Sequence, residues 1–330
     1  MDEGIALKQT AVRLRLPDDD VLPRALLSLG ESHLMRFEDR GDPDDIAQAI
    51  THLEAALTQF DGHGSHRAAF LTSLGQAMWT RYERGIGAVD DLNESVRLLE
   101  TAVALTPADN PSYGSRLSNL ASALWTRFEI SRHPGDLDAA IDHDKAALDA
   151  LPLGHTDRVR VLLNLGLAYQ AQFDQTGEPD HGRRAIATWK VAASLPTTWA
   201  GMRIGTARNA ADLASRMGDT TTALACYEFA IRLLPEVAWH GLTTTGRDRI
   251  LKNWSGLAAQ AAGAALAAER ADIALEMLES GRSVSWDQIL GFRVRLDTLR
   301  RARPDLADRL AKTGASIALA NRALANREAV

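Results

Sequence analysis

The sequence repeats itself about every 45 residues, and this period constrains the fold more than any other feature of the chain. In four successive segments a leucine is followed by a small residue, at Leu29-Gly30, Leu74-Gly75, Leu120-Ala121 and Leu165-Gly166. A period in this range is typical of helical hairpins that stack so that each unit contacts only its neighbours. The sequence therefore predicts an all-α solenoid, an architecture that usually presents binding surfaces and performs no chemistry.

Each segment predicts one helix, an acidic turn and a second helix. In the first segment, apolar residues between Ala25 and Phe37 recur at steps of three and four, the spacing of one helical face. Pro43 cannot continue a helix, so the turn is expected at Gly41-Asp42-Pro43, with Asp44 or Asp45 as the N-cap of the second helix.

The small residue of each pair predicts a close crossing between the two helices. Helices approach closely where one of them presents a small side chain. We expect the four pairs to meet four alanines on the second helices, namely Ala56, Ala102, Ala147 and Ala192.

After Pro196 the period shortens, and the fifth segment resembles a tetratricopeptide repeat (TPR) of ordinary length. The resemblance rests on the offsets of small residues, an aromatic residue and a final proline: Ala207, Ala210, Ala211, Ala214, Gly218-Asp219, Ala223, Tyr227, Ala230 and Pro235. It implies a right-handed superhelical solenoid of about six TPR-like helical hairpins plus C-terminal helices. The expected organisation is an N-terminal segment 1–23, a solenoid 24–281 and a C-terminal capping or docking region 282–330. The expected units are about 24–64, 67–110, 113–155, 158–198, 203–236 and 247–281.

The stretch from Ala274 to Arg282, continued by Trp286, Leu290 and Arg303-Pro304-Asp305-Leu306, resembles a linking region of bacterial CHAT proteins. In those proteins the region joins a TPR array to a caspase-like peptidase domain. The resemblance implies the sensor or regulatory region of a CHAT-type peptidase system, with the peptidase joined in cis or acting in trans. The catalytic His and Cys of such a domain do not follow, so we expect this chain to be no enzyme.

The composition argues against several classes of function and of site. The net charge of −6 argues against dedicated binding of nucleic acid or of an anionic membrane. Cys226 is the single cysteine, which excludes an intrachain disulfide and a multi-thiolate metal site, and we expect it to be an inert helical thiol. His63 and His66 are expected in a solvated loop. We expect a cytoplasmic protein with no metal, no cofactor and no catalytic residue.

The candidate binding site lies in the second and third repeats. Trp79 and Trp125 occupy matching positions, and in TPR proteins that position tends to face the concave groove, where an aromatic residue can anchor a peptide. We expect Gln76, Arg81 and Arg127 to contribute to the same peptide or protein site. Two alternatives stay open. The tryptophans can pack between repeats, and the arginines can hold the acidic turns.

A second candidate surface is the C-terminal region, where four apolar residues exceed what a terminal helix needs: Trp286, Ile289, Leu290 and Phe292. We expect them to dock a partner or a missing domain. Other functions remain open: a nucleic-acid-responsive effector module, which would use the basic C-terminal end, or a stand-alone TPR adaptor or chaperone-like protein.

Overall fold

A computed structural model describes residues 2–13, 21–196, 198–237, 254, 256–280, 299–301 and 303–309. The chain divides into two compact units, Met1–Gln172 and Phe173–Val330, and each is described by itself. Throughout the described residues, all regular secondary structure is helical. The predicted all-α class is therefore confirmed.

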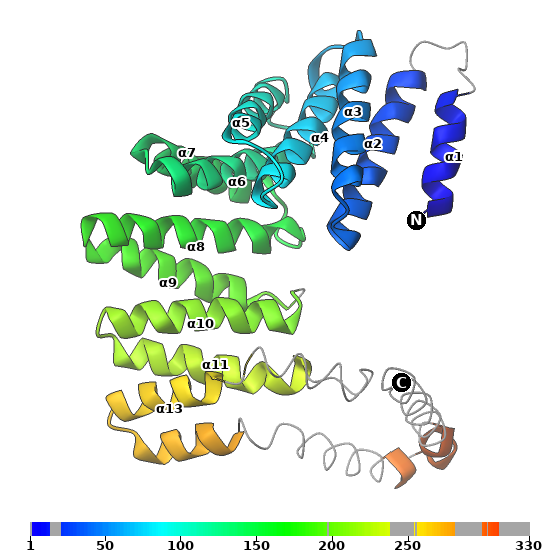
Figure 1. Cartoon of the computed structure of the whole chain (residues 1–330). Coiled ribbons are helices and arrows are strands. Elements are labelled where there is room, and N and C mark those ends of the chain that lie inside the picture. The colour runs from blue at the N-terminus through cyan, green and yellow to red at the C-terminus, as the bar shows by residue number, and fades with distance from the viewer. Residues whose placement is uncertain are drawn as a thin grey trace. The chain divides into compact units, whose positions relative to one another are not determined.

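The first unit consists of a lone helix followed by helical pairs (Figure 1). Helix α1 (Asp2–Arg13) packs on α2. The pairs are α2 (Val21–Arg40) with α3 (Pro43–Gln59), α4 (Gly64–Glu83) with α5 (Val89–Ala104), and α6 (Tyr113–Ser131) with α7 (Pro134–Ala150). The unit closes with most of α8 (Asp157–Thr176), which crosses the division between the units. We refer to α2, α4, α6 and α8 as the A helices, and to the second helix of each pair as a B helix.

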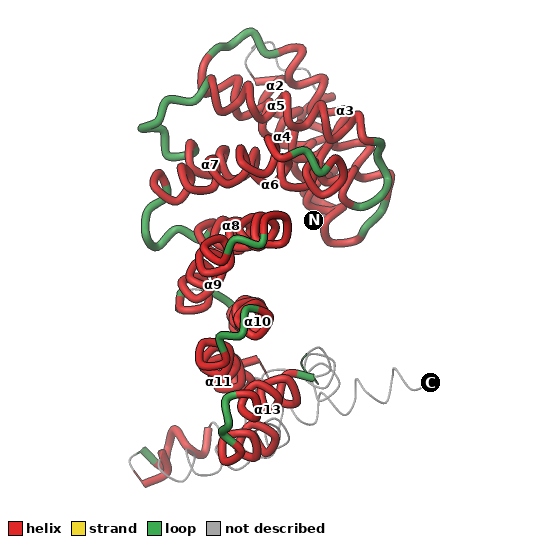
Figure 2. The backbone as a smooth tube through the Cα atoms, turned by 90° about the vertical axis from the view of Figure 1, so that its left-hand side faces the viewer, coloured by secondary structure: helices red, strands yellow, loops and turns green. Residues whose placement is uncertain are grey.

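The second unit contains α9 (Pro179–Ser194), α10 (Ala200–Arg216), α11 (Thr220–Val237) and α13 (Leu257–Ala267). Residues 271–280 are also helical. Figure 2 shows short loops between α9 and α10 and between α10 and α11, and α10 packs against both α9 and α11. Helix α11 continues past Pro235 to Val237, two residues beyond the proline that the TPR pattern places at the end of the repeat.

The first inter-helix turn forms where the sequence predicts it, but with a different cap. Gly41 adopts a left-handed φ of 72°, and Pro43 opens α3. The N-cap is Asp42, whose carboxylate accepts a hydrogen bond from the Asp44 backbone N–H at 3.1 Å. The expectation of Asp44 or Asp45 as the cap was wrong, because Asp45 lies inside the helix, where its carboxylate binds Arg36.

The close crossing of paired helices is confirmed at Gly30 and Gly75. A Cβ atom on Gly30 would lie 2.6 Å from Leu53 Cγ, and one on Gly75 would lie 2.9 Å from Leu99 Cγ. The contacting residues are thus leucines, one turn before the buried alanines Ala56 and Ala102 that the sequence suggested. Each glycine leaves room for the branched end of a leucine on the partner helix.

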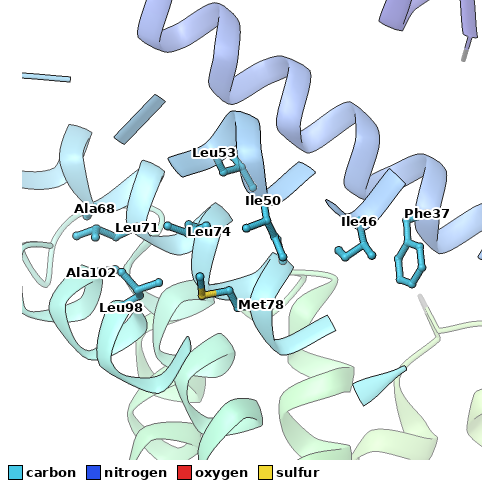
Figure 3. Close-up of a cluster of buried hydrophobic side chains, with 11 residues drawn as sticks. Phe37, Ile46, Ile50, Leu53, Ala68, Leu71, Leu74, Met78, Leu98 and Ala102 are labelled. Carbon is cyan, nitrogen blue, oxygen red and sulfur yellow. The ribbon is translucent and has the colours of Figure 1, made fainter. Parts of the chain in front are cut away.

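One buried core cluster of the first unit is shared by the first two helical pairs. Figure 3 shows a cluster in which Ile50 and Leu53 of α3 meet Leu71 and Leu74 of α4, with Leu98 of α5 beyond them. All five side chains are at most 5% exposed. Stacking therefore buries the apolar face that a single hairpin would leave open.

Several expectations are not tested by this fold. The fourth expected unit, 158–198, spans the division between the compact units, and the proposed domain boundaries stay predictions. The candidate docking residues Trp286, Ile289, Leu290 and Phe292 lie outside the described residues. Among the described helices, none combines the length and the apolar character needed to cross a membrane.

Candidate functional site

Hydrogen bonds between polar side chains link neighbouring A helices in the first unit. Between α2 and α4, the Ser73 hydroxyl donates to Glu31 at 2.8 Å. Between α6 and α8, the Ser122 hydroxyl accepts a hydrogen bond from Asn164 at 3.0 Å and one from Arg160 at 3.2 Å. Glu31 and Ser122 occupy the same position of the repeat, so in the first and third repeats this position binds a side chain of the following A helix.

The contact between α4 and α6 differs from these two. Gln76 occupies the position of Glu31 and Ser122, yet no hydrogen bond joins its amide to any of the described residues. The hydrogen bonds between these two helices come instead from Trp79, whose indole N–H donates to the Thr126 hydroxyl at 2.9 Å, and from Arg116, which donates to the Ser65 carbonyl at 3.3 Å. Gln76 is partly buried, and its side chain carries one acceptor and two donor hydrogens.

Trp79 of α4 and Trp125 of α6 pack against the same apolar cluster. Both are partly buried, and the cluster, which α4, α5, α6 and α7 enclose, is made of Val96, Leu99, Leu120, Ala123, Leu124 and Ala140. The Trp125 ring also lies 5.6 Å from the Phe128 ring, centroid to centroid. Each indole therefore packs between repeats, as one of the two interpretations requires, and keeps part of its surface accessible.

The repeated arginines bind the acidic turns. Arg127 donates from Nε and Nη2 to the two carboxylate oxygens of Asp136 at 2.9 and 2.6 Å, and this interaction raises the pKa of Arg127. Arg81 pairs with Asp91 in the same bidentate way, with Nε at 3.0 Å. The structural role that the sequence left open is thus what the geometry shows.

The first repeat carries a larger version of this ion pair. Arg36 Nε lies 2.8 and 2.9 Å from the carboxylate oxygens of Asp45, and His33 Nδ1 lies 3.0 Å from the same group. Asp45 is buried, and the Arg36 guanidinium is the main cause of its lowered pKa. Asp2 of α1 adds a further contact to Arg36 at 3.0 Å, which ties α1 to the first pair.

Residues i and i+2 lie about 200° apart around a helix. Trp79 accordingly contacts the next A helix, whereas Arg81 contacts the B helix of its own pair. The structure thus places Trp79 at the α4 and α6 contact, with Gln76 one turn earlier on α4 and Trp125 packed against the same apolar cluster as Trp79, and it sets Arg81 and Arg127 apart at the turns. Sequence reasoning had placed all five in one site.

One buried carboxyl was not predicted from the sequence. Asp144 of α7 is 1% exposed and occupies the position that Leu53 and Leu99 fill in the earlier repeats. Its Oδ1 has no hydrogen-bond partner among the described residues, and burial raises the pKa of this carboxyl well above its usual range. A carboxylate at an otherwise apolar position of the repeat was the signal that could have found it.

Cys226 and His63, whose side chains have the chemistry for catalysis or metal binding, occupy structural positions. Cys226 is buried in α11, and burial raises the pKa of its thiol. His63 precedes α4 as its N-cap residue. No cluster of three or more His, Cys, Asp or Glu side chains suited to a metal ion occurs within the described part of the chain.

Comparison with known proteins supports the fold. No family model and no curated protein matches the sequence. Among solved structures, the C-terminal part of a TPR repeat-containing protein from Cytophaga hutchinsonii is 12% identical, with a TM-score of 0.50 over 84% of this chain and 88% of that one. The human IFIT1 dimer with PPP-AAAA is 13% identical, with a TM-score of 0.50 over 84% of this chain and 57% of that one.

A thermophilic TPR protein from Thermus thermophilus is 22% identical and covers 70% of this chain, with a TM-score of 0.41. Such low identities speak for the fold alone. The helical pairs, the glycine crossings and the likenesses to the Cytophaga protein and to IFIT1 together give the chain a TPR-like helical repeat fold.

Proposed function

We propose that this protein is a non-catalytic scaffold that binds an extended segment of a protein partner across α4 and α6. The observation that carries the proposal is the amide of Gln76, which hydrogen-bonds to none of the described residues and lies one helical turn before the partly buried Trp79. Elsewhere in the unit this repeat position binds the next A helix, so the exception leaves a polar group for a ligand.

The chemistry of the three residues suits a peptide. A glutamine side chain offers one acceptor and two donor hydrogens, which match the C=O and N–H of an extended backbone. Tryptophan is enriched among the residues that dominate binding energy at interfaces. Arg81 and Arg127 form their ion pairs through Nε and Nη2, so the remaining Nη1 group of each is proposed as a secondary contact for an acidic flank.

A peptide library displayed on phage, selected against the purified chain, tests this function. Gln76→Ala should weaken binding of the selected peptide by about tenfold without changing the melting temperature. Gln48→Ala, on the exposed side of α3 in the same unit, is the matched control and should bind normally. Equal affinities for the two variants would contradict the proposed site.

A second, more specific proposal concerns the identity of the partner. We propose that the chain is the sensor or regulatory region of a CHAT-type peptidase system, on the resemblance of residues 274–306 to the linking region of such proteins. Its test is co-purification with a CHAT peptidase encoded in the same genome. Truncation after Gly281 should abolish that association if the segment containing Trp286, Ile289, Leu290 and Phe292 docks the peptidase. Unchanged association would remove the assignment and leave the peptide site untouched.

A further inference from the structure

A cavity of about 260 Å³ lies in the second unit, far along the chain from the proposed peptide site. Its walls come from successive B helices: α9 provides Lys190 and Ala193, and α11 provides Cys226, Phe229 and Arg232. The intervening helix α10 contributes Ala207. Figure 1 shows these three helices as neighbours.

The sequence explains why this cavity is not filled by a side chain. Ala193 occupies the repeat position that holds Leu57, Val103 and Leu148 in the first three B helices, and those larger side chains pack against the cores of the first unit. Replacing such a residue by alanine removes the atoms that would fill the space between neighbouring helices. Ala207 opposite leaves it open.

The interior of the cavity is apolar. Ala193, Ala207 and Cys226 are all buried, and Phe229 is half-buried with the Arg203 guanidinium 5.5 Å from its ring centre. The Cys226 thiol belongs to this apolar surface, because burial raises its pKa and keeps it protonated at neutral pH. An apolar group entering the cavity would therefore lose its hydration in favour of dispersion contacts with these side chains.

Two cationic side chains line the cavity, and neither has an ion-pair partner in the part of the chain that the structure describes. These are Lys190 and Arg232, which are both exposed, whereas Arg183, Arg184 and Arg216 of the same unit do form ion pairs. The charge of Lys190 contributes to the lowered pKa of Asp219, but the main cause is Thr222, whose backbone N–H donates a hydrogen bond to this carboxylate at 3.0 Å. The first two repeats have Glu54 and Glu100 at the position of Lys190, so the charge at this position is reversed in the fourth repeat.

We propose that this cavity binds a small carboxylate with an aromatic or branched apolar body, held by Lys190 and Arg232 at its charged end. The volume lies just below the usual range for ligand pockets, so it suits a body of about the size of one aromatic side chain. Lysine and arginine both donate charge-assisted hydrogen bonds to a carboxylate, and the two come from different helices. The ligand thus fills the space that Leu57, Val103 and Leu148 close in the other repeats.

Phenylbutyrate is the probe, and isothermal titration calorimetry on the full chain measures its affinity. Lys190→Ala and Arg232→Ala should each weaken binding by about tenfold. Ala193→Leu restores the side chain of the earlier repeats and should abolish binding. Lys145→Ala is the matched control, because Lys145 has the position of Lys190 in the third repeat but pairs with Asp142 at 3.4 Å; it should bind normally.

The single cysteine supplies an independent reading of the same site. Phenylbutyrate should slow alkylation of Cys226 by iodoacetamide, whereas phenylbutanol, which has the same apolar body without the charge, should protect it only at about tenfold higher concentration. Equal protection by the alcohol, or normal affinity in both Lys190→Ala and Arg232→Ala, would overturn the proposal. So would the absence of binding by phenylbutyrate in both measurements. The two surface variants keep the test decisive even where Ala193→Leu does not fold.

Discussion

Arg127 and Asp136 face each other across the turn between α6 and α7, joined by two hydrogen bonds of 2.9 and 2.6 Å. The same pairing recurs between Arg81 and Asp91 and between Arg36 and Asp45, so each of the first three repeats fixes its turn in the same way. Both side chains of the Arg127 pair are less than one-third exposed. The pair is therefore a structural element of the repeat.

A double-mutant cycle on Arg127→Ala and Asp136→Ala should show a coupling of about 1 to 2 kcal/mol in the free energy of unfolding. Bidentate geometry and partial burial place the pair above an ordinary surface ion pair, which contributes about 0 to 1 kcal/mol. Urea denaturation of the two single variants and the double variant measures it. Additive effects of the two substitutions would show that the turn does not depend on the pair.

Gly75→Ala should destabilise the first unit by roughly 1 to 3 kcal/mol, because the new methyl group would lie 2.9 Å from Leu99 Cγ and 3.3 Å from the Ser95 carbonyl oxygen. Gly263→Ala in α13 is the control. Apart from its own helix backbone, no atom of the described residues lies within 4 Å of its new methyl group, so the better helix propensity of alanine should stabilise by about 1 kcal/mol. Chemical denaturation monitored by circular dichroism compares the two variants. A neutral or stabilising Gly75→Ala would show that the crossing tolerates a larger residue.

Asp144 should make stability depend on pH. The folded chain raises the pKa of this carboxyl, chiefly by burial and against the opposing charge of Arg160. Above the unfolded pKa of about 3.9, the folded state keeps a proton that the unfolded state releases, so the free energy of unfolding falls as pH rises toward the folded pKa.

Asp144→Asn removes the ionisation at nearly constant shape. The variant should match the original chain near pH 4 and exceed its stability at pH 7, by about 1 kcal/mol or more. Thermal unfolding at a series of pH values measures both chains. Parallel curves for the two chains would mean that Asp144 ionises without cost in the folded state.

The fold was largely predictable because the period and the small residues express packing directly. Gly30 and Gly75 marked crossings that the structure contains, although the contacting residues are Leu53 and Leu99. The site was less predictable. Repeat position alone could not say that Trp79 contacts Thr126 or that Gln76 lacks a partner among the described residues, because both depend on which side chains the neighbouring A helix presents. The cavity beside α9 could not be predicted either, because its walls come from three helices, α9, α10 and α11, whose packing the repeat pattern does not specify.

Trp125→Ala should have two effects, since the indole packs on the Leu120 and Leu124 cluster and borders the proposed site. We expect a loss of about 2 to 3 kcal/mol in stability and, in the folded fraction, a loss of about thirtyfold in affinity for a selected peptide. Trp199→Ala is the control, because this residue of the second unit is 63% exposed; it should change neither quantity. Melting temperature and affinity are measured together. If folded Trp125→Ala bound the selected peptide with normal affinity, Trp125 would have a packing role only.

The most direct test of the proposed scaffold function is to locate the bound peptide. A selected peptide carrying a photoreactive benzophenone is crosslinked to the full chain, and mass spectrometry identifies the modified residues. We predict crosslinks within 64–83 and 113–131, the spans of α4 and α6, with competition by the unlabelled peptide and loss of the crosslink in Gln76→Ala. Crosslinks confined to the B helices or to the second unit, or a peptide that crosslinks equally well to Gln76→Ala, would contradict binding across α4 and α6.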